Sequence, residues 1–132
     1  MSLRHYFVVA ALALASGAPA LASAPPAGAS DQSCFLSSDW QGWKSPSPKV
    51  IYLRVRINDV YRLDLSAPAS DLDEPDVHLI SKIQGSDWIC NPLDLQLEVA
   101  DDHGIMREPL FVKSITKLTP DEVKAIPAKF RP

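Results

Sequence analysis

The chain has 132 residues, of which 13 are Lys or Arg and 16 are Asp or Glu, so its formal net charge is −3. This mild acidic balance gives no electrostatic reason to expect nucleic acid or an anionic membrane surface as a partner. The length suits a single domain with one hydrophobic core.

The first 22 residues predict a secretory signal peptide. A short basic region is followed by an unbroken apolar run at 6–15 and then by Ala20-Leu21-Ala22, the small-x-small pattern that a signal peptidase cleaves. We therefore expect cleavage after Ala22. The apolar run is much shorter than the roughly 20 residues of a membrane span. The mature protein is expected to be periplasmic or secreted, without a membrane span.

The two cysteines, Cys34 and Cys90, predict one disulfide. Export leads to an oxidising compartment, and two cysteines allow a single connectivity. A reactive thiol fits less well, because it needs a nearby positive charge or a helix N-terminus, whereas residues 88–90 have the composition of a buried strand. A thiolate metal site needs closely spaced ligand pairs, which neither cysteine has. Strand alternation places Trp88 near the predicted bridge.

Residues 23–32 are small, polar and proline-bearing, so we expect a disordered lead into a single β-rich domain at 33–132. The main strands are predicted at 50–57, 61–65, 77–83, 93–99 and 110–116, where apolar residues recur at alternate positions. We expect Ile57, Ile83 and Leu93 to be inward-facing members of these runs.

The strands at 50–57 and 61–65 are predicted to form a hairpin. A two-residue loop would place charge in the core, so the apolar residues stay inward only with an odd-numbered loop or a bulge. The simplest register of this kind pairs Ile57 with Tyr61, Arg56 with Arg62 and Arg54 with Asp64.

A short helix is predicted at the C-terminus. Thr119 is a suitable N-cap, Pro120 suits the first helical position, and Glu122 completes a capping box with Thr119. Pro127 ends the helix after barely two turns. Six or seven short strands with one C-terminal helix predict a mainly β fold, a small antiparallel barrel or sandwich.

No catalytic motif is present, and no cofactor is predicted. Two acidic segments leave open a metal-dependent or hydrolytic alternative: Asp71, Asp73, Glu74 and Asp76, followed by His78, and the run Asp101, Asp102 and His103. Their carboxylates and imidazoles would hold a divalent cation if the two loops met. The spacing matches no calcium-binding loop, and acidic loops are mostly solvated. We therefore predict no metal site and keep residues 101–103 as the candidate ligands.

A second alternative is a small-anion binder. Arg54, Arg56 and Arg62 are expected on one hairpin face, where guanidinium groups would hold a carboxylate or phosphate. A solvated charged sheet face explains the same pattern. The three tryptophans also have two interpretations, because their rings would either line a ligand groove or pack in the core. They are Trp40, Trp43 and Trp88.

The order of four motifs resembles a family of small exported proteobacterial proteins that carries only a domain-of-unknown-function label. The motifs are CF at 34–35, IYLRVRINDVYRLDL at 51–65, GSDWICNPLD at 85–94 and SITKLTPDEV at 114–123. The resemblance covers 34–126. Family members often carry two further cysteines, at the position of Ala69 and near Leu110, and this chain lacks both. Their joint absence is expected if these two cysteines pair with each other in the family and leave Cys34 to pair with Cys90. The resemblance implies no activity, cofactor or catalytic residue.

Export, one disulfide and the missing catalytic motifs together predict a non-enzymatic binding or envelope-accessory module. The expected partner is an envelope protein or a small ligand. An exposed edge strand would also permit a homodimer.

Overall fold

The computed structural model describes residues 34–83 and 85–132, so the predicted signal peptide and lead lie outside the described residues. In chain order the strands are β1 (Phe35–Leu36), β2 (Trp40–Ser47), β3 (Val50–Val55), β4 (Asp59–Leu65), β5 (Val77–Lys82), β6 (Trp88–Ile89), β7 (Gln96–Asp101), β8 (Arg107–Leu110) and β9 (Val112–Lys117). In the same part of the chain lie one α-helix, α1 (Pro120–Ala125), and three 3₁₀ turns, η1 (Ser37–Asp39), η2 (Pro92–Asp94) and η3 (Ala128–Phe130).

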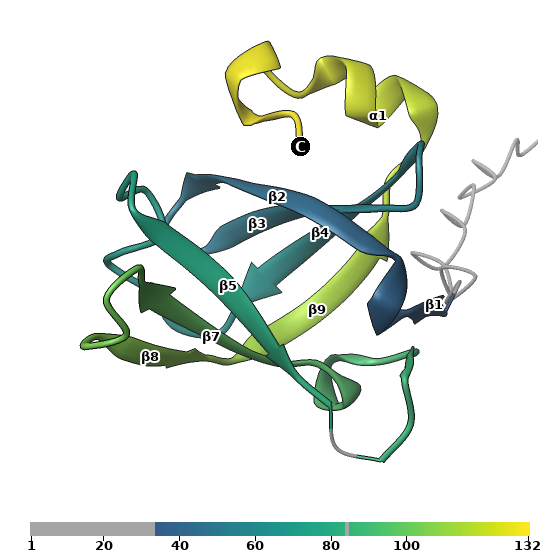
Figure 1. Cartoon of the computed structure of the whole chain (residues 1–132). Helices are drawn as coiled ribbons and strands as arrows, with labels where there is room; N and C mark the ends of the chain where they lie inside the picture. Colours follow the sequence, from purple (N-terminus) through teal and green to yellow (C-terminus); the bar gives the residue numbers. More distant parts are fainter. Residues whose placement is uncertain (1–33, 84) are drawn as a thin grey trace, which may run out of the picture.

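The predicted mainly β class is confirmed. The strands form three antiparallel sheets with the orders β2-β3-β4-β9, β5-β7-β8 and β1-β6. The two larger sheets form a sandwich-like arrangement, and they join at the corner where β8 passes into β9 (Figure 1). The described residues contain nine strands instead of six or seven. Two of these, β1 and β6, are only two residues long, and β8 begins before the strand predicted at 110–116.

The core lies between the two larger sheets. Strand side chains alternate between faces, so the apolar members of each run leave water together on one side. Both sheets contribute fully buried residues: Ile51, Leu53, Val55, Leu63, Leu97 and Val99. The ring centroids of Phe35 and Tyr61 lie 4.6 Å apart. Trp40 and Trp43 pack against this core while staying partly exposed, so two of the three tryptophans belong to it.

The predicted hairpin is formed by β3 and β4, but in a different register. The loop between the paired strands spans residues 56–58, an odd number as expected. The predicted pairing of Ile57 with Tyr61 is wrong, because Ile57 lies in this loop and is 79% exposed. The chain turns earlier because Arg56 adopts a left-handed φ of 56° and its N–H donates to the carbonyl of Asp39 at 2.8 Å.

Two other residues at the ends of predicted strands are exposed instead of inward-facing. Ile83 follows the last residue of β5, and Leu93 lies in η2. In η2 a capping box between Asn91 and Asp94 takes the chain out of extended structure before β7 begins. Such side-chain bonds to the local backbone compete with strand pairing.

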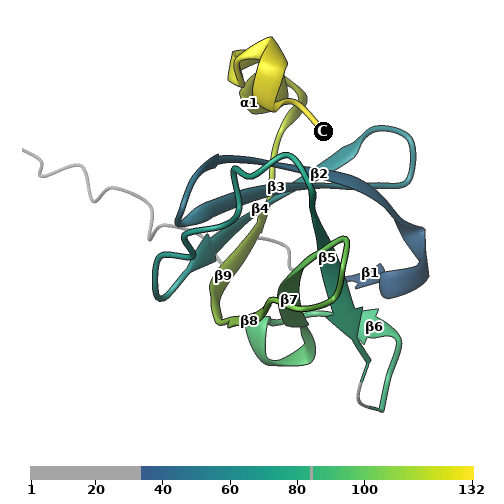
Figure 2. The same ribbon diagram turned by 60° about the vertical axis from the view of Figure 1, so that its left-hand side comes forward.

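The C-terminal helix α1 begins at the predicted cap. The N–H of Glu122 donates to Thr119 Oγ1 at 3.3 Å, and the N–H of Thr119 donates to Glu122 Oε2 at 2.7 Å. The next residue after the helix, Ile126, is buried and lies near Tyr52 and Arg62 of the larger sheet. The C-terminal segment therefore covers the sheet face that points away from the core (Figures 1 and 2).

Candidate functional site

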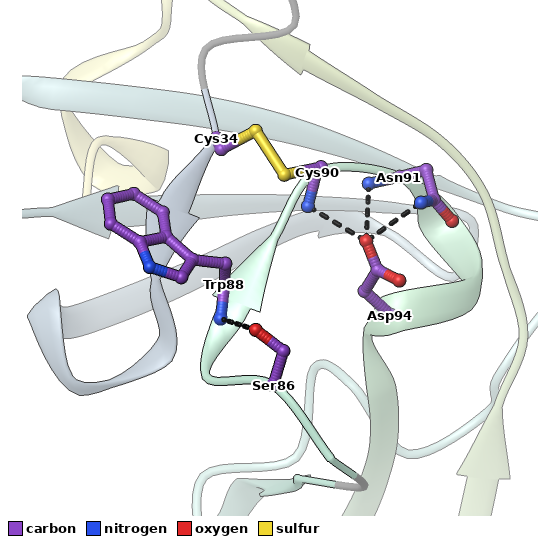
Figure 3. The surroundings of a disulfide bond; sticks show 6 residues. All are labelled: Cys34, Ser86, Trp88, Cys90, Asn91 and Asp94. Carbon is purple, nitrogen blue, oxygen red and sulfur yellow. Dashed lines mark hydrogen bonds between the residues drawn. A yellow bond between two sulfur atoms is a disulfide. The ribbon is translucent and has the colours of Figure 1, made fainter.

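The disulfide links the first described residue to a point far along the chain. Cys34 and Cys90 are bonded, with their Cα atoms 4.3 Å apart and a sequence separation of 56. The bridge lies beside the short β1–β6 ladder, in which Phe35 pairs with Ile89 (Figure 3). The predicted pairing is confirmed. Because no described cysteine keeps a free thiol, cysteine nucleophilic catalysis is excluded in this part of the chain.

Trp88 stands beside the bridge but is not buried. Its side chain is 49% exposed and projects to one side of the Cys34–Cys90 bond (Figure 3). The expectation of a buried strand at 88–90 is wrong for Trp88, and only Ile89 points into the core. Within the described residues, the sheet of β1 and β6 contains no third strand.

Asp94 fixes the turn that follows the bridge. Its Oδ2 atom accepts the backbone N–H groups of Cys90 and Asn91, each at 3.0 Å, and the side-chain Nδ2 of Asn91 at 2.8 Å (Figure 3). The two backbone donors stabilise the charged carboxylate and so hold the pKa of Asp94 below its ordinary value. This network is local and structural.

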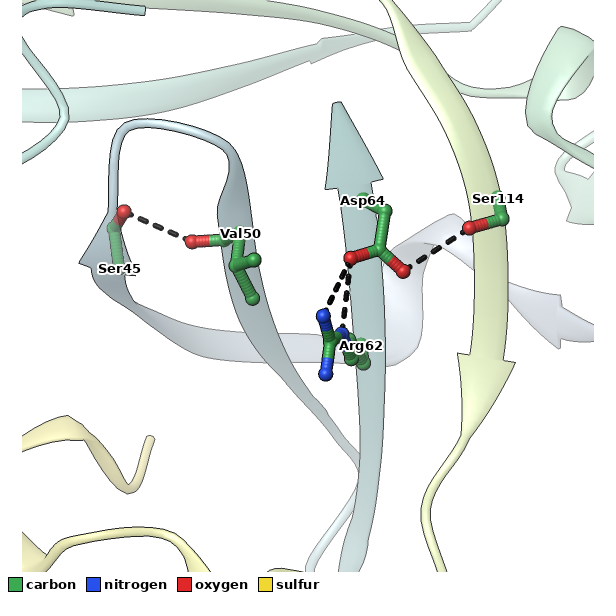
Figure 4. Close-up of polar contacts among 5 residues, drawn as sticks. All are labelled: Ser45, Val50, Arg62, Asp64 and Ser114. Carbon is green, nitrogen blue, oxygen red and sulfur yellow. Dashed lines mark hydrogen bonds and ion pairs between the residues drawn. The ribbon is translucent and has the colours of Figure 1, made fainter. Parts of the chain in front are cut away.

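Two of the three arginines of the predicted anion-binding face are already paired. Arg56 lies in the hairpin turn, and its Nε donates to Asp39 Oδ2 at 2.8 Å. Arg62 donates from two nitrogens to Asp64 Oδ1, at 2.8 and 3.0 Å (Figure 4). Asp64 in turn accepts from the hydroxyl of Ser114 on β9 at 3.1 Å. The predicted pairing of Arg56 with Arg62 is wrong, because Arg62 lies opposite Tyr52 and Arg56 lies outside the paired strands.

Arg54 is the remaining member of that face. It lies opposite Val60, so the predicted Arg54–Asp64 pairing is also wrong. Its Nε atom is buried and has no hydrogen-bond partner among residues 34–83 and 85–132. The three arginines therefore have different local environments: Arg56 and Arg62 each pair with a carboxylate, and the buried Nε of Arg54 has no partner within the described residues.

The two acidic segments do meet. Val77 pairs with Asp101 at one end of the β5-β7-β8 sheet, and the N–H of Asp102 donates to the carbonyl of Asp76 at 3.1 Å. The open cleft at this point measures about 610 Å³, and its acidic and imidazole lining is Asp71, Glu74, Asp76, Asp101, Asp102 and His103. Even so, no three potential ligands of the described ranges are grouped closely enough to hold a metal ion.

His78 was the other candidate of the acidic segments. Its Nδ1 lies 3.5 Å from Asp102 Oδ1, and both side chains are exposed. A carboxylate can orient an imidazole in this way, but acid–base catalysis also needs a positioned reactive group and a site that excludes water. This open acidic surface provides no such enclosure.

A largely apolar cleft was not predicted from the sequence. It measures about 450 Å³ and lies between η2 and the corner that joins β8 to β9. Leu93 and Phe111 are both among its lining residues and are 89% and 65% exposed. Its other apolar residues are Pro92, Leu95, Leu97, Pro109, Leu110 and Val112. We call it the Leu93–Phe111 groove. The run LFV at 110–112 was the available signal, because three consecutive apolar residues in a strand cannot all point inward.

Comparisons with models of known protein families, with curated proteins and with solved structures find no match to this chain. Within 34–83 and 85–132, no helix is long and apolar enough to cross a membrane. The function is therefore argued from the surfaces of the molecule.

The Leu93–Phe111 groove also has polar lining residues. Lys82 on β5 donates to Glu98 Oε1 on β7, and both side chains line the groove. The second carboxylate oxygen, Glu98 Oε2, is buried and has no donor within the described residues. A buried acceptor without a donor costs free energy. Once a rotation of the Glu98 side chain exposes this atom to the groove, an N–H or O–H group of a ligand would remove this cost.

Proposed function

We propose that this chain is an exported, non-enzymatic binding module that holds an extended, apolar polypeptide segment of an envelope protein in the Leu93–Phe111 groove. The observation that carries the proposal is the exposure of two large apolar side chains at one groove of ligand-binding size. Ligand sites of proteins are commonly apolar clefts of about 300–1,000 Å³ with a few polar groups that fix orientation.

An extended polypeptide suits the polar groups of this groove. The negative charge of Glu98 is already balanced by Lys82. A second cation at the groove would therefore leave an excess positive charge. A neutral donor supplies the missing hydrogen bond to Glu98 Oε2 without changing the net charge. A peptide backbone presents N–H donors beside alternating side chains, so its apolar side chains would cover Leu93 and Phe111.

Export and the envelope location are supported by three features. The Cys34–Cys90 disulfide agrees with an oxidising compartment. The signal-peptide pattern at 1–22, and the resemblance to small exported proteobacterial proteins, lead to the same location.

Titration with a blocked apolar pentapeptide, acetyl-Ala-Val-Leu-Val-Ala-amide, tests the proposal by amide chemical-shift changes. We expect the largest changes at 92–98 and 109–112, and about a tenfold loss of affinity in Phe111→Ser, because an anchoring ring is removed. The matched control is Ile57→Ser, which removes an exposed apolar side chain from the β3–β4 loop. This control should bind like the parent chain.

The alternatives give different outcomes. The same peptide with N-methylated amides should bind more weakly, since it cannot donate to Glu98; equal binding would contradict the role of Glu98. No shifts in the groove would contradict the proposal. Dimerisation in ultracentrifugation that Phe111→Ser abolishes would assign the groove to a second copy of the chain instead.

A further inference from the structure

A second cleft lies on another part of the sandwich. It measures about 390 Å³ and is lined by β2, by η3 and by the loop between β4 and β5. The lining residues that matter here are Trp43, Lys44, Asp73, Glu74, Lys129 and Phe130. We call it the Trp43–Phe130 cleft. It shares no lining residue with the Leu93–Phe111 groove.

Charges of both signs line this cleft from different segments. The cations are Lys44 on β2 and Lys129 on η3, two elements that contact each other. The acids are Asp73 and Glu74 on the loop. Within the described ranges none of these four side chains forms an ion pair, although other charged residues of the fold do so, such as Arg62 with Asp64. All four side chains are exposed, so the cleft presents cations and acids that are not paired with each other.

Apart from Ser45, the other lining residues are apolar or aromatic. Trp43 and Phe130 are half-buried, and Leu72 beside them is buried. The Nζ atom of Lys129 lies 4.6 Å from the ring centroid of Phe130, which is within the range of a cation–π interaction. A ligand in the cleft would therefore meet aromatic surface together with charges of both signs.

We propose that the Trp43–Phe130 cleft binds a short peptide with free ends, with the size of a dipeptide. Its carboxylate is bound by Lys44 and Lys129, and its ammonium group by Asp73 and Glu74. Its side chains pack on the rings of Trp43 and Phe130. Charge-assisted hydrogen bonds are stronger than neutral ones, and four unpaired charges in one cavity match both ends of such a zwitterion. The volume is at the lower end of the range of small-ligand sites.

L-alanyl-L-leucine is the probe, and its binding is followed by the indole N–H signal of Trp43 in two-dimensional NMR spectra, assigned with Trp43→Phe. We expect a saturable shift of this signal, with the other two indole signals unchanged. Lys129→Glu and Asp73→Lys should each weaken binding by about tenfold, because each replaces an attraction with a repulsion. The matched controls are Lys113→Glu and Asp87→Lys, whose side chains are exposed and lie outside the cleft lining.

Blocked versions of the probe separate the two ends. N-acetylation should remove the effect of Asp73→Lys, and amidation of the carboxyl group should remove the effect of Lys129→Glu. An unchanged Trp43 signal, equal binding of the doubly blocked dipeptide, or equal losses in the control variants would each overturn the proposal. Phe111→Ser should leave this binding unchanged, so failure here is distinguishable from failure of the proposed groove.

Discussion

At the scale of single residues, Asp94 shows how one carboxylate organises a segment. Its Oδ2 atom collects three donors from Cys90 and Asn91, and this holds the chain between the disulfide and β7. The backbone donors favour the ionised form, so the pKa of Asp94 in the folded protein is lower than in the unfolded chain.

This shift predicts a dependence of stability on pH. A carboxylate with a lowered folded pKa stabilises the protein above its unfolded pKa of about 3.9 and loses this contribution as the pH falls through the folded pKa. We expect Asp94→Asn to be less stable than the parent chain in urea at pH 7, and the difference to shrink steadily below about pH 4. Asp87→Asn, an exposed control, should show no such trend. A gap that stays constant down to pH 2 would contradict the assignment to ionised Asp94.

Several single residues could be predicted from the sequence. The pairing of Cys34 with Cys90 was predictable because only one connectivity exists, and the Thr119 cap because a capping box is a contact between neighbours in sequence. The partners of the arginines were not predictable. Asp39 reaches Arg56 only because η1 lies beside the hairpin turn, a contact between residues that are far apart in the chain.

At the scale of elements, the period of two identified which side chains of β3, β4 and β7 point inward but not where each strand ends. Ile57, Ile83 and Leu93 continue the alternation and yet are exposed. At Ile57 a turn and at Leu93 a capped 3₁₀ turn replace the strand, and hydrophobic alternation carries no information about such local contacts. The register of the hairpin was predicted wrongly for this reason.

The observed register predicts different costs for two isoleucines of the hairpin. Ile51 is fully buried in β3, so Ile51→Ala should lower the free energy of unfolding by about 2–5 kcal/mol. Ile57 is in the β3–β4 loop, so Ile57→Ser should change it by less than about 0.5 kcal/mol. Urea unfolding of both variants measures the two values. A loss of several kcal/mol for Ile57→Ser would mean that its side chain is inside, as in the register predicted from the sequence.

At the scale of the whole molecule, both proposed binding surfaces lie where segments distant in sequence come together. The Leu93–Phe111 groove combines η2 with the corner between β8 and β9, and the Trp43–Phe130 cleft combines β2, an internal loop and the C-terminal segment. Composition and periodicity describe each segment but not which segments become neighbours. The β class could therefore be predicted from the sequence, while the sites required the packing of the sheets.

The Cys34–Cys90 bridge is the constraint that acts on the whole chain. It closes a loop with a sequence separation of 56, and it joins the residue before β1 to the residue after β6 at one end of their two-residue ladder. In the chain-entropy model a loop of this length restricts the unfolded state by about 4 kcal/mol, and loss of a disulfide from a small secreted domain typically costs about 2–5 kcal/mol. We expect the double variant Cys34→Ser, Cys90→Ser to have a free energy of unfolding that is lower by an amount within that range. Denaturant unfolding of the variant, and of the parent chain with and without reductant, measures it. The variant should unfold like the reduced parent, because both lack the same crosslink. Two titratable thiols in the unfolded, unreduced parent chain would show that the bridge is absent, and equal stability of the oxidised and reduced forms would show that it does not stabilise the fold.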